Sequence, residues 1–148
     1  WSHASEEGYQ IINSLYAFGS GGLFGMGLGN SRQKLDFLPE HHTDFIFAIL
    51  AEELGFIGAF FVLLLFFVIA WRGYRIALNC PDTFGSYLAV GITSNIIIQA
   101  FINIGVVTGA LPVTGIALPF LSYGGSSLLF TMISVGILLN ISRYSHAK

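Results

Sequence analysis

Three long apolar runs, separated by short polar or irregular stretches, dominate the pattern of this chain. The first run contains no charged residue from Leu54 to Trp71, and Gly55 within it permits close contact with another helix. No Asp, Glu, Lys or Arg occurs between residues 83 and 142, which is enough for two membrane crossings of about 20 residues each. The pattern predicts an all-α, polytopic transmembrane helical bundle with spanning helices near residues 45–71, 84–107 and 126–142.

Two other segments have no sustained helical pattern. Residues 1–43 mix polar and apolar positions, so we expect an extracellular loop region with a short amphipathic helix at the interface near 9–18. The Gly-rich stretch at 19–31 matches neither phosphate-loop pattern, which argues against a nucleotide site. Residues 108–125 combine Pro and Gly with apolar residues, and such backbone is tolerated in a membrane protein only when buried or lining a cavity. We expect a re-entrant-like loop that folds against the region of Asp44.

Composition excludes a soluble domain. Charged residues make up 9% of the chain, against roughly 25% in soluble proteins. The net charge of −2, with only six Lys and Arg, argues against a nucleic-acid surface. The single cysteine, Cys80, excludes an internal disulfide and a cysteine-cluster metal site. Because the chain starts without Met and with polar residues, we expect it to be the C-terminal part of a longer membrane protein.

The basic residues predict the orientation. One side of the predicted arrangement carries Arg72, Arg75, Arg143 and Lys148. The other side carries Arg32 and Lys34, beside several carboxylates. The positive-inside rule then places the 72–83 loop and the C-terminus in the cytoplasm. The Gly-rich stretch, Asp44 and the Pro/Gly loop would all lie at the outer face.

Asp44 is the residue from which we expect chemistry. It stands where a polar stretch gives way to the first apolar run, and a carboxylate there is costly unless it is solvated, paired or in use. Thr43 is suited to cap the helix, so Asp44 would lie in the first turn, where the helix dipole favours its ionised form. Transfer of a group to a hydroxyl needs a base for the hydroxyl proton and a cation for an anionic leaving group. One carboxylate beside loop cations meets that minimum.

Polar residues also occur inside the predicted helices. Asn95, Gln99 and Asn103 fall on one stripe, which either bonds helices together or lines a substrate groove. Glu52 and Glu53 point about 100° apart on a helix, so one should face the protein interior and the other the interface. We favour a helix-positioning role over a catalytic role for both glutamates.

Three stretches of the sequence resemble the SEDS family (shape, elongation, division and sporulation), nearest its FtsW and SpoVE branch. They are YQIINSLYAFGSGGLFGMGLGNSRQK at 9–34, LPEHHTDFIFAILAEELGFIG at 38–58 and LPVTGIALPFLSYGGSS at 111–127. The resemblance implies a polytopic fold of which this chain holds the last three helices and the large outer loop before them. It also implies a peptidoglycan glycosyltransferase that polymerises lipid II outside the bacterial cytoplasmic membrane, serving division, sporulation or cell shape. The isolated segment should be inactive.

The resemblance also assigns site residues. The family's essential aspartate, in its HTDF motif, matches Asp44, and a second acidic position of the family matches Asp36. The expected substrate-binding residues on the matching motifs are Arg32, Lys34, Asp36, Glu40, His42, Thr43, Pro112, Thr114, Pro119, Ser122, Gly124, Gly125 and Ser126. The expected partners are lipid II, a class B penicillin-binding protein transpeptidase and membrane lipids.

The sequence leaves alternatives open for the cofactor and for the function. The adjacent His41 and His42 with Asp44 lack the usual zinc spacing, so no histidine-ligated metal is predicted. A Mg²⁺ or Mn²⁺ ion that bridges carboxylates and pyrophosphate stays open. A lipid II flippase also stays open, because polar stripes and broken helices are transporter features. A non-catalytic scaffold for the transpeptidase is the third alternative.

Overall fold

The computed structural model of the chain describes residues 12, 16, 19, 22–25, 27, 46–112, 114–121 and 124–145. Within these residues all regular structure is helical. Three helices are long and apolar enough to cross a membrane: α3 (Ile46–Asn79), α4 (Thr83–Val107) and α5 (Gly125–Ser145). This confirms the predicted all-helical, membrane-spanning class. Ile12, Tyr16 and Gly19 are helical, while the rest of the predicted interfacial helix lies outside the described residues.

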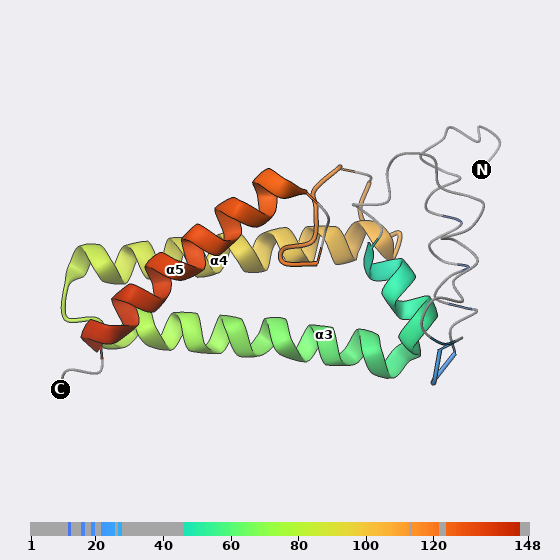
Figure 1. Ribbon diagram of the computed structural model, residues 1–148, viewed down its shortest axis with the longest axis horizontal. Coiled ribbons are helices and arrows are strands. Elements are labelled where there is room, and N and C mark those ends of the chain that lie inside the picture. Colours follow the sequence, from blue (N-terminus) through green and yellow to red (C-terminus); the bar gives the residue numbers. More distant parts are fainter. Residues whose placement is uncertain are drawn as a thin grey trace.

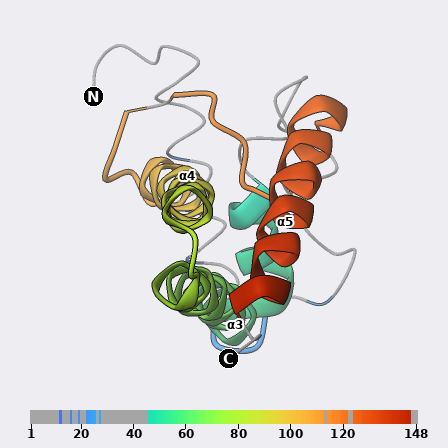
Figure 2. The ribbon, with the colours of Figure 1, turned by 90° about the vertical axis from the view of Figure 1, so that its left-hand side faces the viewer.

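The three helices form a small bundle that is not a single layer. Figure 1 shows α3 and α4 running alongside each other, with α5 crossing them at an angle. Viewed along the bundle in Figure 2, α3, α4 and α5 occupy the three corners of a triangle. The chain passes from α3 to α4 at one end of the bundle and from α4 to α5 by way of the other end.

The first helix is longer than predicted. α3 continues to Asn79, although the sequence analysis ended it at Trp71 and assigned 72–83 to a loop. Arg72 marks the end of the uncharged run, but arginine is a good helix former and the backbone keeps its helical bonding beyond it. The turn is short because Asp82 caps α4, its carboxylate accepting the Gly85 amide at 2.9 Å. α5 likewise extends to Ser145, where 126–142 was predicted.

α3 and α4 pack closely near this short turn. A Cβ on Gly73 would overlap the side chain of Thr93, so the two backbones approach each other at a position that only glycine fits. The hydroxyls of Tyr74 and Ser94 share a hydrogen bond of 2.9 Å, and the Ser86 hydroxyl donates to a backbone carbonyl of α3 at 2.7 Å. These contacts hold the two helices as a rigid hairpin.

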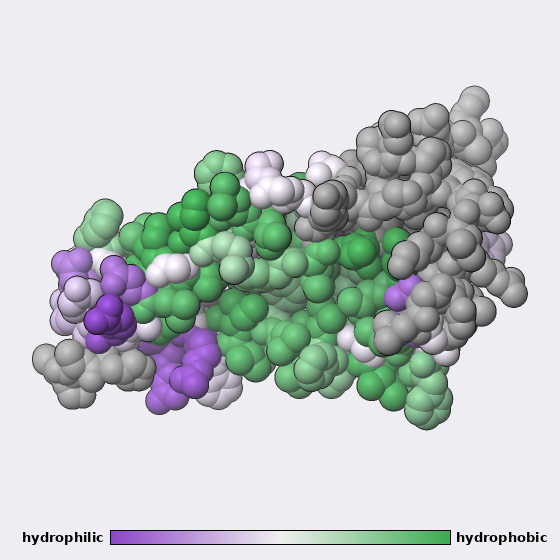
Figure 3. Space-filling view, in the orientation of Figure 1, coloured by the Kyte–Doolittle hydropathy of each residue, from purple (hydrophilic) through white to green (hydrophobic). Residues whose placement is uncertain are grey.

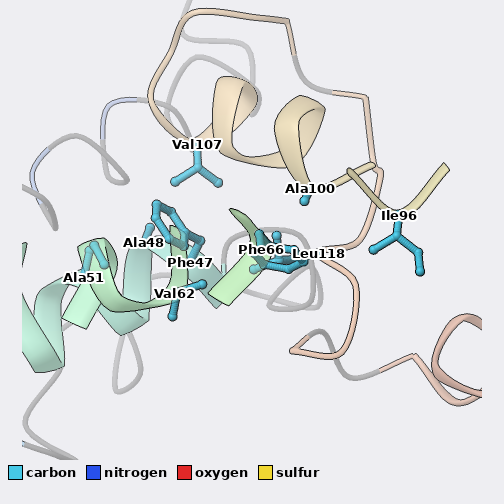
Figure 4. Packing of buried hydrophobic residues seen from close by; sticks show 10 residues of the cluster. Phe47, Ala48, Ala51, Val62, Phe66, Ile96, Ala100, Val107 and Leu118 are labelled. Carbon is cyan, nitrogen blue, oxygen red and sulfur yellow. The ribbon is translucent and has the colours of Figure 1, made fainter. Parts of the chain in front are cut away.

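The main core lies between α3, α4 and the loop that follows α4. Figure 4 shows the labelled members of this cluster, which are Phe47, Ala48, Ala51, Val62, Phe66, Ile96, Ala100, Val107 and Leu118. Outside the core the surface is apolar over the middle of the bundle (Figure 3). Such a surface is what lipid tails or further membrane helices cover.

Candidate functional site at the loop end

The two ends of the bundle differ in the regularity of their backbone. At one end α3 and α5 finish and α4 begins; we call it the helix end. At the other end α3 begins, α4 finishes and the loop 108–124 starts its return to α5 (Figure 1). We call this second end, with the Gly-rich segment 22–27 beside it, the loop end. The described members of the predicted site belong to the loop after α4 and to the first turn of α5.

α3 is broken near its start. Gly55 has φ 71° and ψ −166°, so the helix consists of a short piece before this residue and a long rod after it. Figure 1 shows the first turns of α3 set at a sharp angle to the rod. The sequence analysis missed this break, because one glycine inside an apolar run is compatible with a continuous helix.

The Gly-rich segment pairs with the broken backbone. The Gly27 amide donates to the Glu53 carbonyl at 3.1 Å, and the Phe56 amide donates to the Gly22 carbonyl at 2.9 Å. A break in a membrane helix leaves such groups without their helical partners, and lipid cannot replace them. The segment is therefore a partner for the helix break.

This pairing requires glycine on both sides. A Cβ on Gly25 would overlap the Glu53 carbonyl, and a Cβ on Gly55 would overlap the backbone of the Gly-rich segment. Both residues also have positive φ, 75° at Gly25 and 71° at Gly55, a region that residues with a Cβ rarely adopt. Gly55 thus permits close approach of a loop, where the sequence analysis expected another helix.

The loop after α4 folds back onto the bundle. The Asn103 side-chain amide donates to the Ile116 carbonyl at 2.7 Å. Leu118, 1% exposed, lies in the same buried cluster as Phe47, and Pro119 is also fully buried. The later part of the loop, from Ile116 to Phe120, is therefore packed on the bundle, whereas the part from Gly109 to Pro112 is exposed. Its predicted approach to Asp44 itself stays a prediction, because that aspartate lies outside the described residues.

One strained residue lies in this loop. Phe120 has φ 67°, although it is not glycine, and its side chain packs against the buried cluster. A bulky residue keeps such a conformation only where its surroundings determine it, at a cost of about 1–3 kcal/mol. The packing of Phe120 and Leu118 thus fixes the path of the loop just before α5.

An apolar cavity lies between the two irregular segments. Its volume is 210 Å³, and it is lined by Gly22 of the Gly-rich segment, by residues on both sides of the α3 break, and by Thr108 at the end of α4. The lining side chains include Phe47 and Phe56. The volume is below the roughly 300–1,000 Å³ of typical ligand pockets, so the cavity suits part of an acyl or prenyl chain better than a sugar.

The polar residues within the helices differ in how deeply they are buried. Glu52 is 2% exposed and Glu53 is partly exposed, in agreement with the prediction that they face different surroundings. Of the amide stripe, Asn103 is 1% exposed and holds the loop, which supports a structural role for it. Asn95 is exposed and accepts a hydrogen bond of 3.3 Å from Gln99, so these two amides are not committed to the core.

The structure locates about half of the predicted site. Pro119 is buried, Gly124 is partly buried, and Pro112, Thr114, Gly125 and Ser126 are exposed. These six residues belong to the loop after α4 and the first turn of α5. The other predicted residues lie outside the described part of the chain: Arg32, Lys34, Asp36, Glu40, His42, Thr43, Asp44 and Ser122. Their roles stay predictions.

Together, the apolar helices and the irregular loop end define a multi-pass membrane protein with its unusual backbone gathered at one end. A sequence profile of the family described as FtsW/RodA/SpoVE, cell cycle protein, matches residues 1–147. The chain therefore belongs to the FtsW/RodA/SpoVE family of cell cycle proteins. This confirms the family that the motifs predicted.

Two relatives come from Bacillus subtilis (strain 168). Stage V sporulation protein E is 68% identical over 145 residues, which are 98% of this chain and 40% of that protein. The probable peptidoglycan glycosyltransferase FtsW is 55% identical over 151 residues, covering 100% of this chain and 38% of that protein. The chain thus spans about two-fifths of the length of these relatives.

A solved structure is also similar. It is described as "Structural coordination of polymerization and crosslinking by a peptidoglycan synthase complex". One of its chains matches with a TM-score of 0.78 and 32% identity, over 95% of this chain and 38% of that chain. At this identity the likeness supports the same family as well as the same fold.

We predict that the loop end depends on the glycine pair. Gly25→Ala or Gly55→Ala should lower the stability of the complete protein by about 1–3 kcal/mol, because alanine disfavours positive φ and its methyl group would push the paired backbones apart. The measurement is the apparent melting temperature of the purified protein in detergent. Gly91→Ala is the control, since Gly91 is exposed in α4 with no atom near an added Cβ. A Gly55→Ala variant as stable as the control would contradict the pairing.

We also predict that Asn103 holds the loop after α4. Asn103→Ala removes a buried amide and leaves the Ile116 carbonyl without that donor, so the protein should lose about 1–3 kcal/mol of stability. Limited proteolysis within 108–121 should become faster. Asn95→Ala, at an exposed position of the same stripe, should change neither property. Equal effects of the two substitutions would show that the loop has another anchor.

Proposed function

We propose that the protein containing this chain is a peptidoglycan glycosyltransferase, which polymerises lipid II into glycan strands. The observation that carries the proposal is the 55% identity, across the whole chain, to a protein named a probable peptidoglycan glycosyltransferase. The match to Stage V sporulation protein E supports sporulation or division as the process served.

The proposed reaction joins two lipid II molecules at their sugars. The Asp44 carboxylate takes the proton of the attacking hydroxyl on one molecule. The hydroxyl oxygen then bonds to the anomeric carbon of the other molecule, while the bond from that carbon to the pyrophosphate oxygen breaks. Undecaprenyl pyrophosphate leaves, and Arg32 and Lys34 stabilise its charge. In the alternative with a Mg²⁺ or Mn²⁺ ion, carboxylates of the same segment would hold the ion, which would supply that positive charge.

The loop end supplies the walls for this chemistry. Thr114 and Ser126 are exposed and so available to a sugar or peptide group, whereas buried Pro119 shapes the loop. Asp36, Glu40, His42 and Thr43 complete the proposed substrate site on the segment before α3. The 210 Å³ apolar cavity fits part of the lipid chain.

The proposed location is the bacterial cytoplasmic membrane, with the loop end on the outer face. Arg72, Arg75 and Arg143 all lie at the helix end, near the finish of α3 and α5. Basic residues concentrate on the cytoplasmic side of membrane proteins, so the helix end faces the cytoplasm. The proposed protein partner is a class B penicillin-binding protein transpeptidase, which the similarity to a chain in a peptidoglycan synthase complex supports.

A lipid II flippase is the second candidate. The observation that favours it is the break at Gly55, since discontinuous membrane helices occur in many transporters. The two functions differ in what purified protein does without a membrane. Only a polymerase forms glycan strands in detergent, where no transport takes place.

We predict that Asp44→Asn lowers the rate of lipid II polymerisation by the complete protein by about 10²–10⁴-fold, because the amide keeps the shape and removes the base. Lipid II binding should change little. The measurement is glycan-strand formation in detergent, with and without the transpeptidase partner. Asp82→Asn is the matched control: it lies at the helix end, and asparagine is also a good helix cap, so activity should be retained.

Two results would change this assignment. Full polymerisation by Asp44→Asn would refute a catalytic role and favour the scaffold or flippase. Recovery of the variant by added Mg²⁺ or Mn²⁺ would make Asp44 a metal ligand instead of the general base.

A further inference from the structure

A second cavity lies at the helix end, at the opposite end of the bundle from the 210 Å³ cavity of the loop end. Its volume is 830 Å³, and it is lined by α3 and α5 near their ends. This volume is within the range of sites that hold small ligands. Figure 3 shows hydrophilic residues gathered at this end of the molecule, next to the apolar middle.

The cavity presents positive charge. Arg72 and Arg75 line it, both exposed, and the described part of the chain offers no hydrogen bond or ion pair to either guanidinium. They are neighbours on one face of α3, where two like charges repel unless a counter-charge lies between them. Asn79, also in the lining, adds an amide donor. An anion between the two guanidinium groups would supply this counter-charge.

No carboxylate among the described residues lines the cavity. Asp82 is the only described acidic residue at the helix end, and its carboxylate caps α4 by accepting the Gly85 amide at 2.9 Å. The hydroxyls of Ser142 and Ser145 line the cavity but already donate to backbone carbonyls, at 2.6 and 2.8 Å. The two guanidinium groups are therefore the main free donors.

The presence of both arginines is not explained by a role as counter-charges for the negative end of the α3 helix dipole. The negative end of a helix dipole acts within the last turn. Arg72 lies about two turns before Asn79, at 3.6 residues per turn, and so is too far from the helix end. Arg143 does lie in the last turn of its helix, and it does not line the cavity.

The cavity lies where a membrane surface is expected. The uncharged run of α3 ends at Trp71, which is 59% exposed, and Tyr144 near the end of α5 is 65% exposed. Exposed Trp and Tyr at the ends of membrane-spanning segments mark the headgroup region of a bilayer. The cavity also has an apolar wall, formed by Ile76 and by Leu139, which is 60% exposed.

We propose that this cavity is a binding site for an anionic phospholipid of the leaflet at the helix end. Arg72 and Arg75 hold the headgroup phosphate through charge-assisted hydrogen bonds, with Asn79 as a third donor. The acyl chains run along Leu139 and the apolar face of α5. The apolar wall favours a lipid over a soluble phosphate compound, and the site is independent of the proposed polymerase activity.

The test measures lipid binding to the complete purified protein. Phosphatidylglycerol and phosphatidylcholine are titrated separately, and bound lipid is counted by native mass spectrometry. The unaltered protein should prefer phosphatidylglycerol. Replacing both arginines (R72Q and R75Q together) should weaken phosphatidylglycerol binding about tenfold, which corresponds to loss of a charge-assisted contact.

Arg143→Gln is the matched control, because it removes the same charge at the same end outside the cavity lining. It should leave phosphatidylglycerol binding unchanged. Equal weakening by Arg143→Gln would overturn the site and leave a general electrostatic attraction. Unchanged binding in the folded double Gln variant would also overturn it.

Two further arms complete the experiment. Replacing both arginines by lysine keeps the charge but loses the planar fork, so binding should fall between the unaltered protein and the double Gln variant. The double Lys variant keeps the test valid if the double Gln variant does not fold. A folded double Lys variant that binds as tightly as the unaltered protein would refute headgroup recognition by guanidinium. Inorganic phosphate should not displace the lipid at equal concentration, and displacement would identify a soluble phosphate compound as the ligand.

Discussion

A helix that breaks inside a membrane protein leaves peptide groups that lipid cannot satisfy, so the break in α3 must find partners within the protein. The Gly-rich segment supplies them through Gly22 and Gly27, which bond to the backbone on either side of Gly55. Because these contacts join backbone to backbone, side chains are excluded at the closest point. The direction of the first turns of α3, and of any group carried into them, therefore depends on a loop that precedes them in the sequence.

The loop after α4 is also irregular backbone whose polar groups find partners within the protein, but here the partner is a side chain. The buried amide of Asn103 bonds to the Ile116 carbonyl, and Leu118 then enters the cluster that contains Phe47 from the first turns of α3. The Gly-rich segment is thus fixed at the break in α3, and the loop is fixed by α4 and by the cluster between α3 and α4. Irregular backbone with satisfied polar groups keeps its shape, which the proposed transfer between two substrates would require.

The spans of the three helices could be predicted because the length of an apolar run reflects the thickness of a bilayer. Their ends could not. Arg72 ends the uncharged run of the sequence, whereas the helix itself ends at Asn79, just before Pro81 and the Asp82 cap. The break at Gly55 could not be predicted either. The backbone that pairs with it lies in the Gly-rich segment, which has no hydrophobic periodicity from which its position could be inferred.

Side-chain burial divided residues that look equivalent in the sequence. Asn95 and Asn103 share a stripe of α4, but only Asn103 meets the returning loop, and a Pro/Gly loop has no pattern from which its path follows. The candidate site was predicted from motifs, and the structure places six of its later residues: Pro112, Thr114, Pro119, Gly124, Gly125 and Ser126. The first half, around Asp44, still rests on the motif and its place before an apolar helix.

The contrast between the two ends explains what each can contribute. At the helix end the three backbones are regular and satisfied, so recognition there relies on the side chains of Arg72, Arg75 and Asn79. At the loop end the backbone itself is shaped, and it can position a reacting group. Between them α3 exposes large apolar side chains such as Phe60 and Phe67, at 57% and 64%. The chain spans about two-fifths of the length of its relatives. An exposed apolar face of this kind is what lipid tails or other membrane helices cover.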